Sequence, residues 1–390
     1  MSPSRQKGEF LFGRVPGCLN CGDKMEYNES IKATAMRFGK RGNEMNTVDF
    51  LREVTAMPGL PGHEHAVSAH IARTFAPLAD DVRVDGMNNV TARCGDAGPR
   101  IVVAAHQDEI GLCVRKIEED GALRIASSGG VDPRILPAAK VHVWAKDGEL
   151  IGFVGAKAPH LLTEAERNEA AQMQDMYVDL GMSAEKVHAL VRVGDMITLD
   201  GALIELANGR IASKTLDDRA GVAAMLCAAE ELNKLKHNAT ALFVSTVQEE
   251  VSFLGGMTAG YAHAPDAAIA IDVTHGAGPG TGKWEAFPLT SLVLSCGPSI
   301  HAGLFARLKE TAKRNGIDCN IEVTTGRTGT DADPLHLVRE GIPSVLISIP
   351  LRYMHTTVET IDAKMIEQCG RLIALFIRDL AAEWGDIEWY

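Results

Sequence analysis

Imidazole and carboxylate side chains recur at the ends of apolar runs in this sequence. They are His106, Glu249, Glu250, Asp272 and His355, and a further acidic pair, Asp217 and Asp218, precedes a helical pattern. Neutral imidazole together with carboxylate is the ligand mixture expected for zinc or a similar divalent cation. Carboxylates that converge from separate segments would repel one another without such a cation. The set therefore indicates a metal site.

Each of these signals is weak when it is taken alone. A single His after a strand is more often a core or loop residue than a ligand. Adjacent acids such as Glu249 and Glu250 are usually a solvated face, and Asp217-Asp218 before a helix is by default a cap. The indication comes from the whole set, because the carboxyl ends of strands in an open α/β sheet are where ligands bind.

The apolar runs that position these side chains have the pattern of strands buried on both faces. They lack polar alternation, and they cover residues 101–105, 241–247, 267–273 and 344–349. Amphipathic helical patterns accompany them at 47–57, 218–235, 300–315 and 363–384. This alternation predicts an α/β fold with a mostly parallel sheet and flanking helices.

Residues 112–210 have a different pattern. Short alternating strands are broken by Gly, Pro and Asp turns, and they cover 123–125, 141–144, 150–154 and 196–199. Such spacing is typical of a small β-rich unit. We therefore expect residues 112–210 to be a domain inserted into a catalytic α/β domain, which residues 45–111 and 211–390 form.

Residues 1–44 show neither helical nor strand periodicity, and we expect a disordered extension, with Met45 as an alternative start. Cys18 and Cys21 form a C-x2-C pair there, but a structural zinc site needs two further ligands. We expect no metal role for this pair.

Composition limits the classes of protein that the chain can belong to. With 46% hydrophobic and 23% charged residues, the 390-residue chain has the makeup of a soluble globular protein. Its formal net charge of -12 repels phosphate backbones, so a nucleic-acid partner is not expected. The apolar runs are far shorter than the roughly 20 residues of a membrane helix, and no secretory leader is visible. These features predict no membrane association and a cytoplasmic location.

Six motifs in this order resemble the family of tetrahedral and glutamyl aminopeptidases, which are co-catalytic two-metal peptidases. They are His-x-Asp-Glu-Ile-Gly at 106–111, Leu-Asp-Asp-Arg-Ala-Gly at 216–221, Val-Gln-Glu-Glu-Val at 247–251, Ile-Asp-Val-Thr-His at 271–275, Gly-Thr-Asp-Ala at 329–332 and Arg-Tyr-Met-His at 352–355. The similarity extends from about Met45 to the C-terminus. Family members also have a small β-barrel inserted after the first motif, which agrees with the β-rich pattern of 112–210.

The resemblance implies two divalent metal ions per subunit, zinc or cobalt and alternatively manganese. Asp217 would bridge the two ions. His106 and Asp272 would complete the first site, and Glu250 and His355 would complete the second. An open position would remain for water.

The resemblance also implies roles for two neighbours of these ligands. Glu249 would be the general base that takes a proton from the attacking water and delivers it to the leaving amine. Asp108, two residues beyond His106, would orient its imidazole. The implied activity is that of a metallo-aminopeptidase that hydrolyses N-terminal residues from short peptides. The Gly-Thr-Asp-Ala segment would either position the substrate backbone or form a buried turn.

The resemblance further implies a homo-oligomer. Family members form dimers through the inserted domain and then assemble into hollow dodecamers, so residues 112–210 are expected to mediate dimerisation. The sequence has Leu254 where the family commonly has Arg, and Thr356-Thr357 where it commonly has Ser-Pro. None of these positions is a predicted ligand, so the implied chemistry is unchanged.

Three other classes of function differ from this one in what they need from the sequence. A glycosidase would need a paired acid and base that flank a cleft lined with aromatic residues, and aromatic residues make up only 5% of this chain. A two-metal deacylase or dipeptide-type hydrolase would use the same ligands, but such relatives usually hold the insert and the last His in other sequence contexts. A non-enzymatic metal-binding module would have no need of the base Glu249. The preferred N-terminal residue stays open, although Arg327, Lys283 or Arg352 could supply a positive pocket if they are not surface or structural charges.

Overall fold

The computed structural model describes residues 46–164, 172–282 and 286–387 of the 390-residue chain. The extension predicted for residues 1–44, with Cys18 and Cys21, lies outside these residues.

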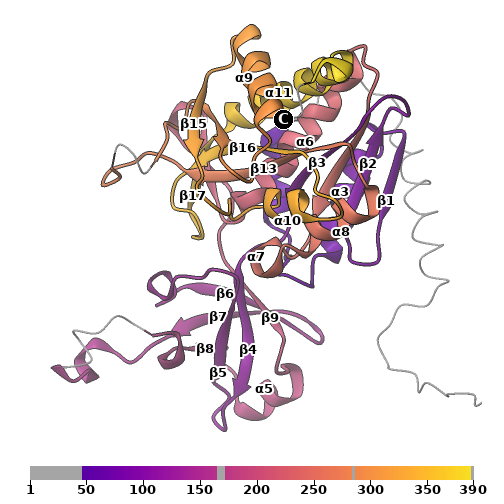
Figure 1. Cartoon of the computed structure of the whole chain (residues 1–390). Coiled ribbons are helices and arrows are strands. Elements are labelled where there is room, and N and C mark those ends of the chain that lie inside the picture. Colours follow the sequence, from indigo (N-terminus) through magenta and orange to yellow (C-terminus); the bar gives the residue numbers. More distant parts are fainter. Residues whose placement is uncertain (1–45, 165–171, 283–285, 388–390) are drawn as a thin grey trace, which may run out of the picture. The chain divides into compact units, whose positions relative to one another are not determined.

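A mixed eight-stranded sheet forms the centre of the larger domain (Figure 1). Its order is β1 (Asp81–Val84), β2 (Val90–Cys94), β12 (Thr240–Thr246), β3 (Arg100–His106), β13 (Ala267–His275), β16 (Ser344–Leu351), β14 (Leu292–Cys296) and β15 (Cys319–Val323). The four central strands, β12, β3, β13 and β16, run parallel to one another. Antiparallel pairs occur toward the two edges, between β1 and β2, β2 and β12, and β14 and β16. The α/β fold class predicted from the sequence is confirmed.

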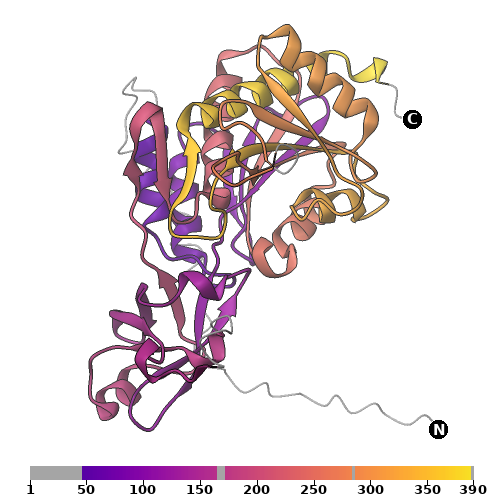
Figure 2. The ribbon, with the colours of Figure 1, turned by 90° about the vertical axis from the view of Figure 1, so that its left-hand side faces the viewer.

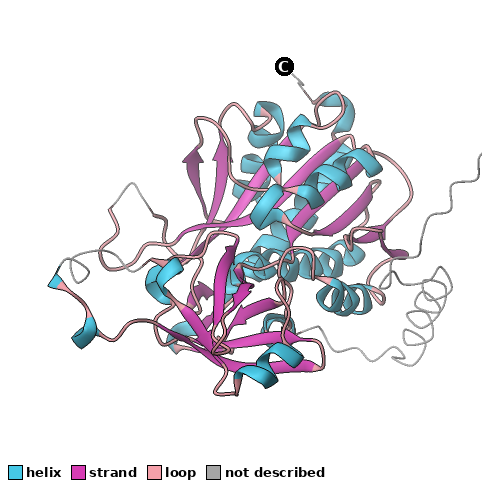
Figure 3. Ribbon diagram, turned by 90° about the horizontal axis from the view of Figure 1, so that it is seen from below, coloured by secondary structure: helices cyan, strands magenta, loops and turns pink. Residues whose placement is uncertain are grey.

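Helices cover the central strands, which explains why those strands have no polar alternation. Helices α6 (Leu216–Lys234) and α11 (Ala363–Ala382) pack together on one side, and α8 (Leu254–His263) and α10 (Ala332–Leu337) contact the central strands from the other (Figure 1). Figure 3 shows helices flanking the strands of the large sheet. The α6–α11 contact is close because Gly370 has no side chain. A Cβ at Gly370 would lie only 2.5 Å from the Cβ of Cys227. The other helices of this domain are α2 (Thr47–Thr55), α3 (His65–Phe75), α7 (Glu249–Ser252) and α9 (Ala302–Arg314).

The inserted segment forms a closed six-stranded barrel, as predicted (Figure 2). Its strands, in order around the barrel, are β4 (Gly111–Ile117), β5 (Leu123–Ser128), β8 (Tyr177–Asp179), β7 (Gly148–Gly155), β6 (Lys140–Ala145) and β9 (Met196–Leu199). Buried aliphatic residues and Met176 fill its interior, and helix α5 (Ala184–Leu190) contributes Val187 to this core. Closure of the barrel pairs every one of its strands. The side chains inside the closed barrel form an apolar core that belongs to the insert.

A small three-stranded sheet follows the barrel. It contains β10 (Ile204–Glu205), β11 (Arg210–Ser213) and β17 (Glu359–Asp362). Strand β11 leads directly into the segment before α6, and β17 follows the loop that contains His355. Pairing of β11 with β17 therefore brings the surroundings of Asp217 and His355 together.

None of the helices within the described residues combines the length and apolarity that a membrane span requires.

Candidate active site

The ends of three neighbouring parallel strands position most of the predicted site residues. His106 ends β3, Asp272 lies near the end of β13, and β12 leads into α7, which begins with Glu249 and Glu250. Parallel strands direct their carboxyl ends toward the same edge of a sheet. The strand pattern thus accounts for the way side chains more than a hundred residues apart reach one cavity of about 360 Å³.

Asp217 reaches the same cavity from an irregular helix start. Its φ and ψ of -79° and 107° are not helical, and the Asp217–Asp218 peptide bond is cis. Asp218, not Asp217, has the capping contact, because its Oδ1 accepts a hydrogen bond from the backbone N–H of Gly221. The capping role that is the default for this acidic pair therefore falls to Asp218, and the Asp217 carboxylate faces the cavity.

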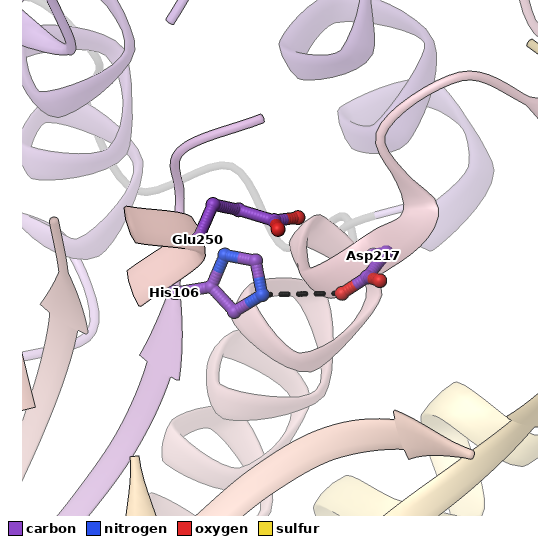
Figure 4. A group of neighbouring side chains, drawn as sticks. All are labelled: His106, Asp217 and Glu250. Carbon is purple, nitrogen blue, oxygen red and sulfur yellow. Dashed lines mark hydrogen bonds and ion pairs between the residues drawn. The ribbon is translucent and has the colours of Figure 1, made fainter. Parts of the chain in front are cut away.

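The side chains of His106, Asp217 and Glu250 point toward one another (Figure 4). One potential ligand atom from each lies within 4.8 Å of those of the other two. His106 Nε2 is 3.1 Å from Asp217 Oδ1. This is the spacing that a group of metal ligands requires.

His355 adds a second imidazole to this cluster from the loop after β16. Its Nε2 lies 3.3 Å from Asp217 Oδ2 and 3.5 Å from Glu250 Oε2. Its Nδ1 is 3.0 Å from the carbonyl oxygen of Gly130, in the inserted segment. Because a carbonyl can only accept, Nδ1 donates the hydrogen bond and Nε2 is left free to bind a cation. The two oxygens of Asp217 thus face two different imidazoles.

Glu249 and Asp272 line the same cavity, but they lie outside the short contacts that join His106, Asp217, Glu250 and His355. Glu249 Oε2 is 3.9 Å from His106 Nε2, and Glu249 Oε1 is buried with no hydrogen-bond partner among the described residues. Asp272 Oδ1 accepts a hydrogen bond of 2.7 Å from the N–H of Val273. Among the described residues, no hydrogen bond or ion pair joins Asp272 to His106 or Asp217.

The electrostatics of the cavity fit bound cations. Burial, together with the negative charges of Asp272 and Asp331, raises the pKa of Glu249 to about 11. Burial and the charge of Asp217 raise the pKa of Glu250 to about 7 and that of Asp272 well above its usual range. Positive charge at this place would oppose all three shifts, since it favours the ionised carboxylates. The donor set and its burial therefore suit divalent metal ions.

Asp108 lies behind the cluster and is fully buried. Its Oδ1 is 3.5 Å from His106 Nδ1, which is long for a hydrogen bond. Its two oxygens also accept hydrogen bonds from the backbone N–H groups of Glu249 and Glu250, at 3.1 and 3.2 Å. Asp108 therefore holds the first turn of α7 in addition to facing the imidazole, and the sequence did not indicate this second contact.

Glu359 is a positioning residue that the sequence analysis missed. It is 2% exposed, and its two oxygens accept hydrogen bonds from the backbone N–H groups of Asp217 and His355, at 3.1 and 3.0 Å. One carboxylate thus fixes the backbone of two cluster members. The available signal was an acidic residue four residues after a candidate ligand.

The Gly-Thr-Asp-Ala segment combines residues that line the cavity with a buried carboxylate, and its role toward a substrate stays a prediction. Gly329 and Thr330 line the cavity, where a substrate would lie. Asp331 is instead buried, and its carboxylate accepts a hydrogen bond from the hydroxyl of Thr246. Asp331 therefore fixes the segment to β12 through Thr246, and Gly329 and Thr330 form part of the cavity wall.

Comparison with solved structures first gives the class of protein. An aminopeptidase from the archaeon Desulfurococcus kamchatkensis matches the fold with a TM-score of 0.81 and 33% identity, covering 87% of this chain and 96% of that chain. The TET1 peptidase of Pyrococcus horikoshii, described as able to assemble into a tetrahedron or a large octahedral shell, matches with a TM-score of 0.75 and 30% identity, covering 84% and 99%. The fold is therefore that of aminopeptidases.

Sequence comparison then gives the family. The model of the M42 glutamyl aminopeptidases matches residues 88–372, and the chain belongs to this family. A lysyl aminopeptidase of Pyrococcus furiosus is 34% identical over 338 residues, which are 85% of this chain and 97% of that relative. The chain is therefore an aminopeptidase, a peptide hydrolase, and the predicted family resemblance is confirmed.

Proposed function

We propose that this aminopeptidase hydrolyses N-terminal residues from short peptides with two divalent metal ions, zinc or cobalt and alternatively manganese. Asp217 would bind both ions, His106 and Asp272 would hold one, and Glu250 and His355 would hold the other. The observation that supports this most directly is the division of the Asp217 oxygens between the two imidazoles, at 3.1 and 3.3 Å. When bound, such ions lower the pKa of water, polarise a carbonyl group and stabilise negative charge on its oxygen.

Glu249 is the proposed general base. Its carboxylate lies at the edge of the cluster, and one oxygen has no hydrogen-bond partner among the described residues, so it is available to accept a proton from water. The same group would then deliver that proton to the leaving amine. Asp108 and Glu359 would keep the cluster in place through the backbone N–H groups that they accept from.

An activity screen tests this proposal. Metal-free protein should regain cleavage of aminoacyl-chromophore substrates when zinc, cobalt or manganese is added, and chelation should remove the activity again. Matched substrates with an acetylated α-amino group should stay uncleaved. Preferential cleavage of the acetylated substrates would support the deacylase alternative, and metal-independent cleavage would contradict the metal roles.

We also propose that the chain forms a homo-oligomer through the inserted domain. The inserted domain exposes large apolar side chains: Ile151 and Phe153 on β7 and Leu161 in the turn after it are between 53% and 68% exposed. Such exposure on a small domain suits a protein interface. Light scattering should find a dimer or a larger assembly up to a dodecamer, and Phe153→Asp should reduce its mass. A strictly monomeric metal-loaded protein would contradict the proposal.

A further inference from the structure

Glu322 lies in the same cavity as the proposed metal ligands, although it comes from the edge strand β15. The strand register places it on their side of the sheet. Asp272 pairs with Ser348 of β16, Ser348 pairs with Val293 of β14, and Ser295, two residues further along β14, pairs with Glu322. Paired residues and residues two apart share a face of a sheet. Glu322 therefore faces the same side as Asp272.

Neutral hydroxyl groups hold the Glu322 carboxylate in place. Its Oε1 accepts a hydrogen bond from Thr274 Oγ1 at 3.2 Å, and its Oε2 accepts one from Ser295 Oγ at 3.3 Å. Within the described parts of the chain, no Lys, Arg or His forms an ion pair with Glu322. The two contacts fix the direction of the carboxylate and leave its negative charge without a cationic partner.

No described Lys or Arg side chain balances this charge from elsewhere in the cavity lining. Arg352 donates a hydrogen bond from its Nε to the carbonyl oxygen of Ala277, and Arg327 is exposed outside the lining. Lys283 lies outside the described residues. The positive pocket considered from the sequence is therefore not formed by Arg327 or Arg352.

We propose that Glu322 makes this cavity selective for peptides whose N-terminal side chain is a cation, lysine or arginine. This rests on the proposed function, in which Asp217, Glu250 and Asp272 bind metal ions and Glu249 is the general base. Among the described lining carboxylates, Glu322 is then the one without a cationic partner. An ammonium or guanidinium group can form charge-assisted hydrogen bonds with it, whereas an acidic side chain would be repelled.

Kinetics with matched substrates test the proposal. Chromophore substrates of lysine and of norleucine, a neutral chain of nearly the same length, separate charge from size. We expect kcat/KM for lysine to exceed that for norleucine by about 10- to 100-fold, which corresponds to a hydrogen bond to a charged group. Glu322→Gln should reduce this ratio to within about threefold, with little change for norleucine.

The control is Asp318→Asn. Asp318 is exposed just before β15 and does not line the cavity, so this variant removes the same charge nearby. It should keep the lysine preference. If the wild-type protein cleaves norleucine or glutamate substrates as well as lysine substrates, or if Glu322→Gln keeps the preference, the proposal is wrong.

Binding of free amino acids gives a second readout that needs no turnover. Calorimetry on the metal-loaded protein should find lysine bound more tightly than norleucine, and Glu322→Gln should abolish the difference. Loss of cleavage of every unblocked substrate would contradict the proposed function alone, because the calorimetric comparison would still decide the role of Glu322. Equal affinities of the wild-type protein for lysine and norleucine would overturn the proposed role of Glu322.

Discussion

Different kinds of side chain are buried at the rim of the large sheet, meaning the edge where the candidate site lies, and in the interior of the barrel. The barrel core contains only apolar side chains, and the one buried polar residue among its described strands is Thr198, whose hydroxyl accepts a hydrogen bond from Trp144 Nε1. The rim buries carboxylates from five segments of the chain: Asp108, Asp217, Glu249, Asp272 and Glu359. Burial of apolar area stabilises a fold, whereas burial of carboxylates destabilises it unless partners are present.

This difference suggests that the rim contributes to metal binding and catalysis, whereas the barrel interior contributes to the stability of the fold. Burial and mutual repulsion raise the pKa of Glu249, Asp272 and Glu359, so the rim is a place where the free protein is under electrostatic stress. Bound cations would relieve that stress. Substitutions at the rim should therefore change metal binding and rate more than folding, and substitutions in the barrel interior should do the reverse.

The largest effect is expected for Asp217→Ala, because this carboxylate faces both imidazoles. The variant should lose both metal ions and lower kcat/KM by more than about 10⁴-fold, beyond the typical effect of losing a general base. Elemental analysis and kinetics measure the two quantities. Asp147→Ala, in the exposed turn between β6 and β7, is the control and should change neither. Two equivalents of metal retained by Asp217→Ala would show that Asp217 does not bridge.

Glu249→Gln should have the next largest effect. Glutamine keeps the size of the side chain and removes the proton acceptor, so the metals should stay bound, KM should change little and kcat should fall by about 10²- to 10⁴-fold. The matched variant Glu250→Gln should instead weaken metal binding first, since Glu250 Oε2 is 3.5 Å from His355 Nε2. Near-normal kcat with both metals present in Glu249→Gln would exclude Glu249 as the base.

Leu136→Ala tests the other side of the comparison. Leu136 is fully buried in the barrel core, and its truncation should lower the free energy of unfolding by about 2–5 kcal/mol. Below the unfolding temperature, kcat should change less than about threefold, because this core has no group in the reaction. Thermal unfolding measures the loss, and Lys186→Ala on the exposed face of α5 should leave the melting temperature unchanged. A large fall in kcat of Leu136→Ala at a temperature where the variant is fully folded would show that the barrel core also affects catalysis.

The smallest effect is expected from removing the first 44 residues. A chain that starts at Met45 should fold and cleave substrate as well as the full chain, because all candidate site residues lie between His106 and Glu359. Activity of the two proteins under the same metal conditions measures this. Lost activity, or one equivalent of zinc bound through Cys18 and Cys21, would assign a role to this segment.

The central strands could be predicted from the sequence because covering helices leave an unbroken apolar pattern. The run 101–105 became β3, Arg100–His106, with its ends displaced by one residue. The end of β13 was missed, since Thr274 and His275 interrupt the apolar run but still pair with Pro350 and Leu351. The helix predicted from residue 218 corresponds to α6, which starts at Leu216 and has non-helical backbone angles at Asp217 and Asp218. Two adjacent acids give no local sign of such a distortion.

The sequence alone determined which chemical groups are available and that they follow buried strands, because strand periodicity and side-chain type are local properties. Only the tertiary structure decided how those groups meet. His355 donates to the carbonyl of Gly130 across 225 residues of sequence, and Glu359 accepts from Asp217 across 142. Glu322 joins the cavity only through the register of three strand pairs. No local pattern encodes such contacts, since they depend on which distant segments the sheet brings side by side.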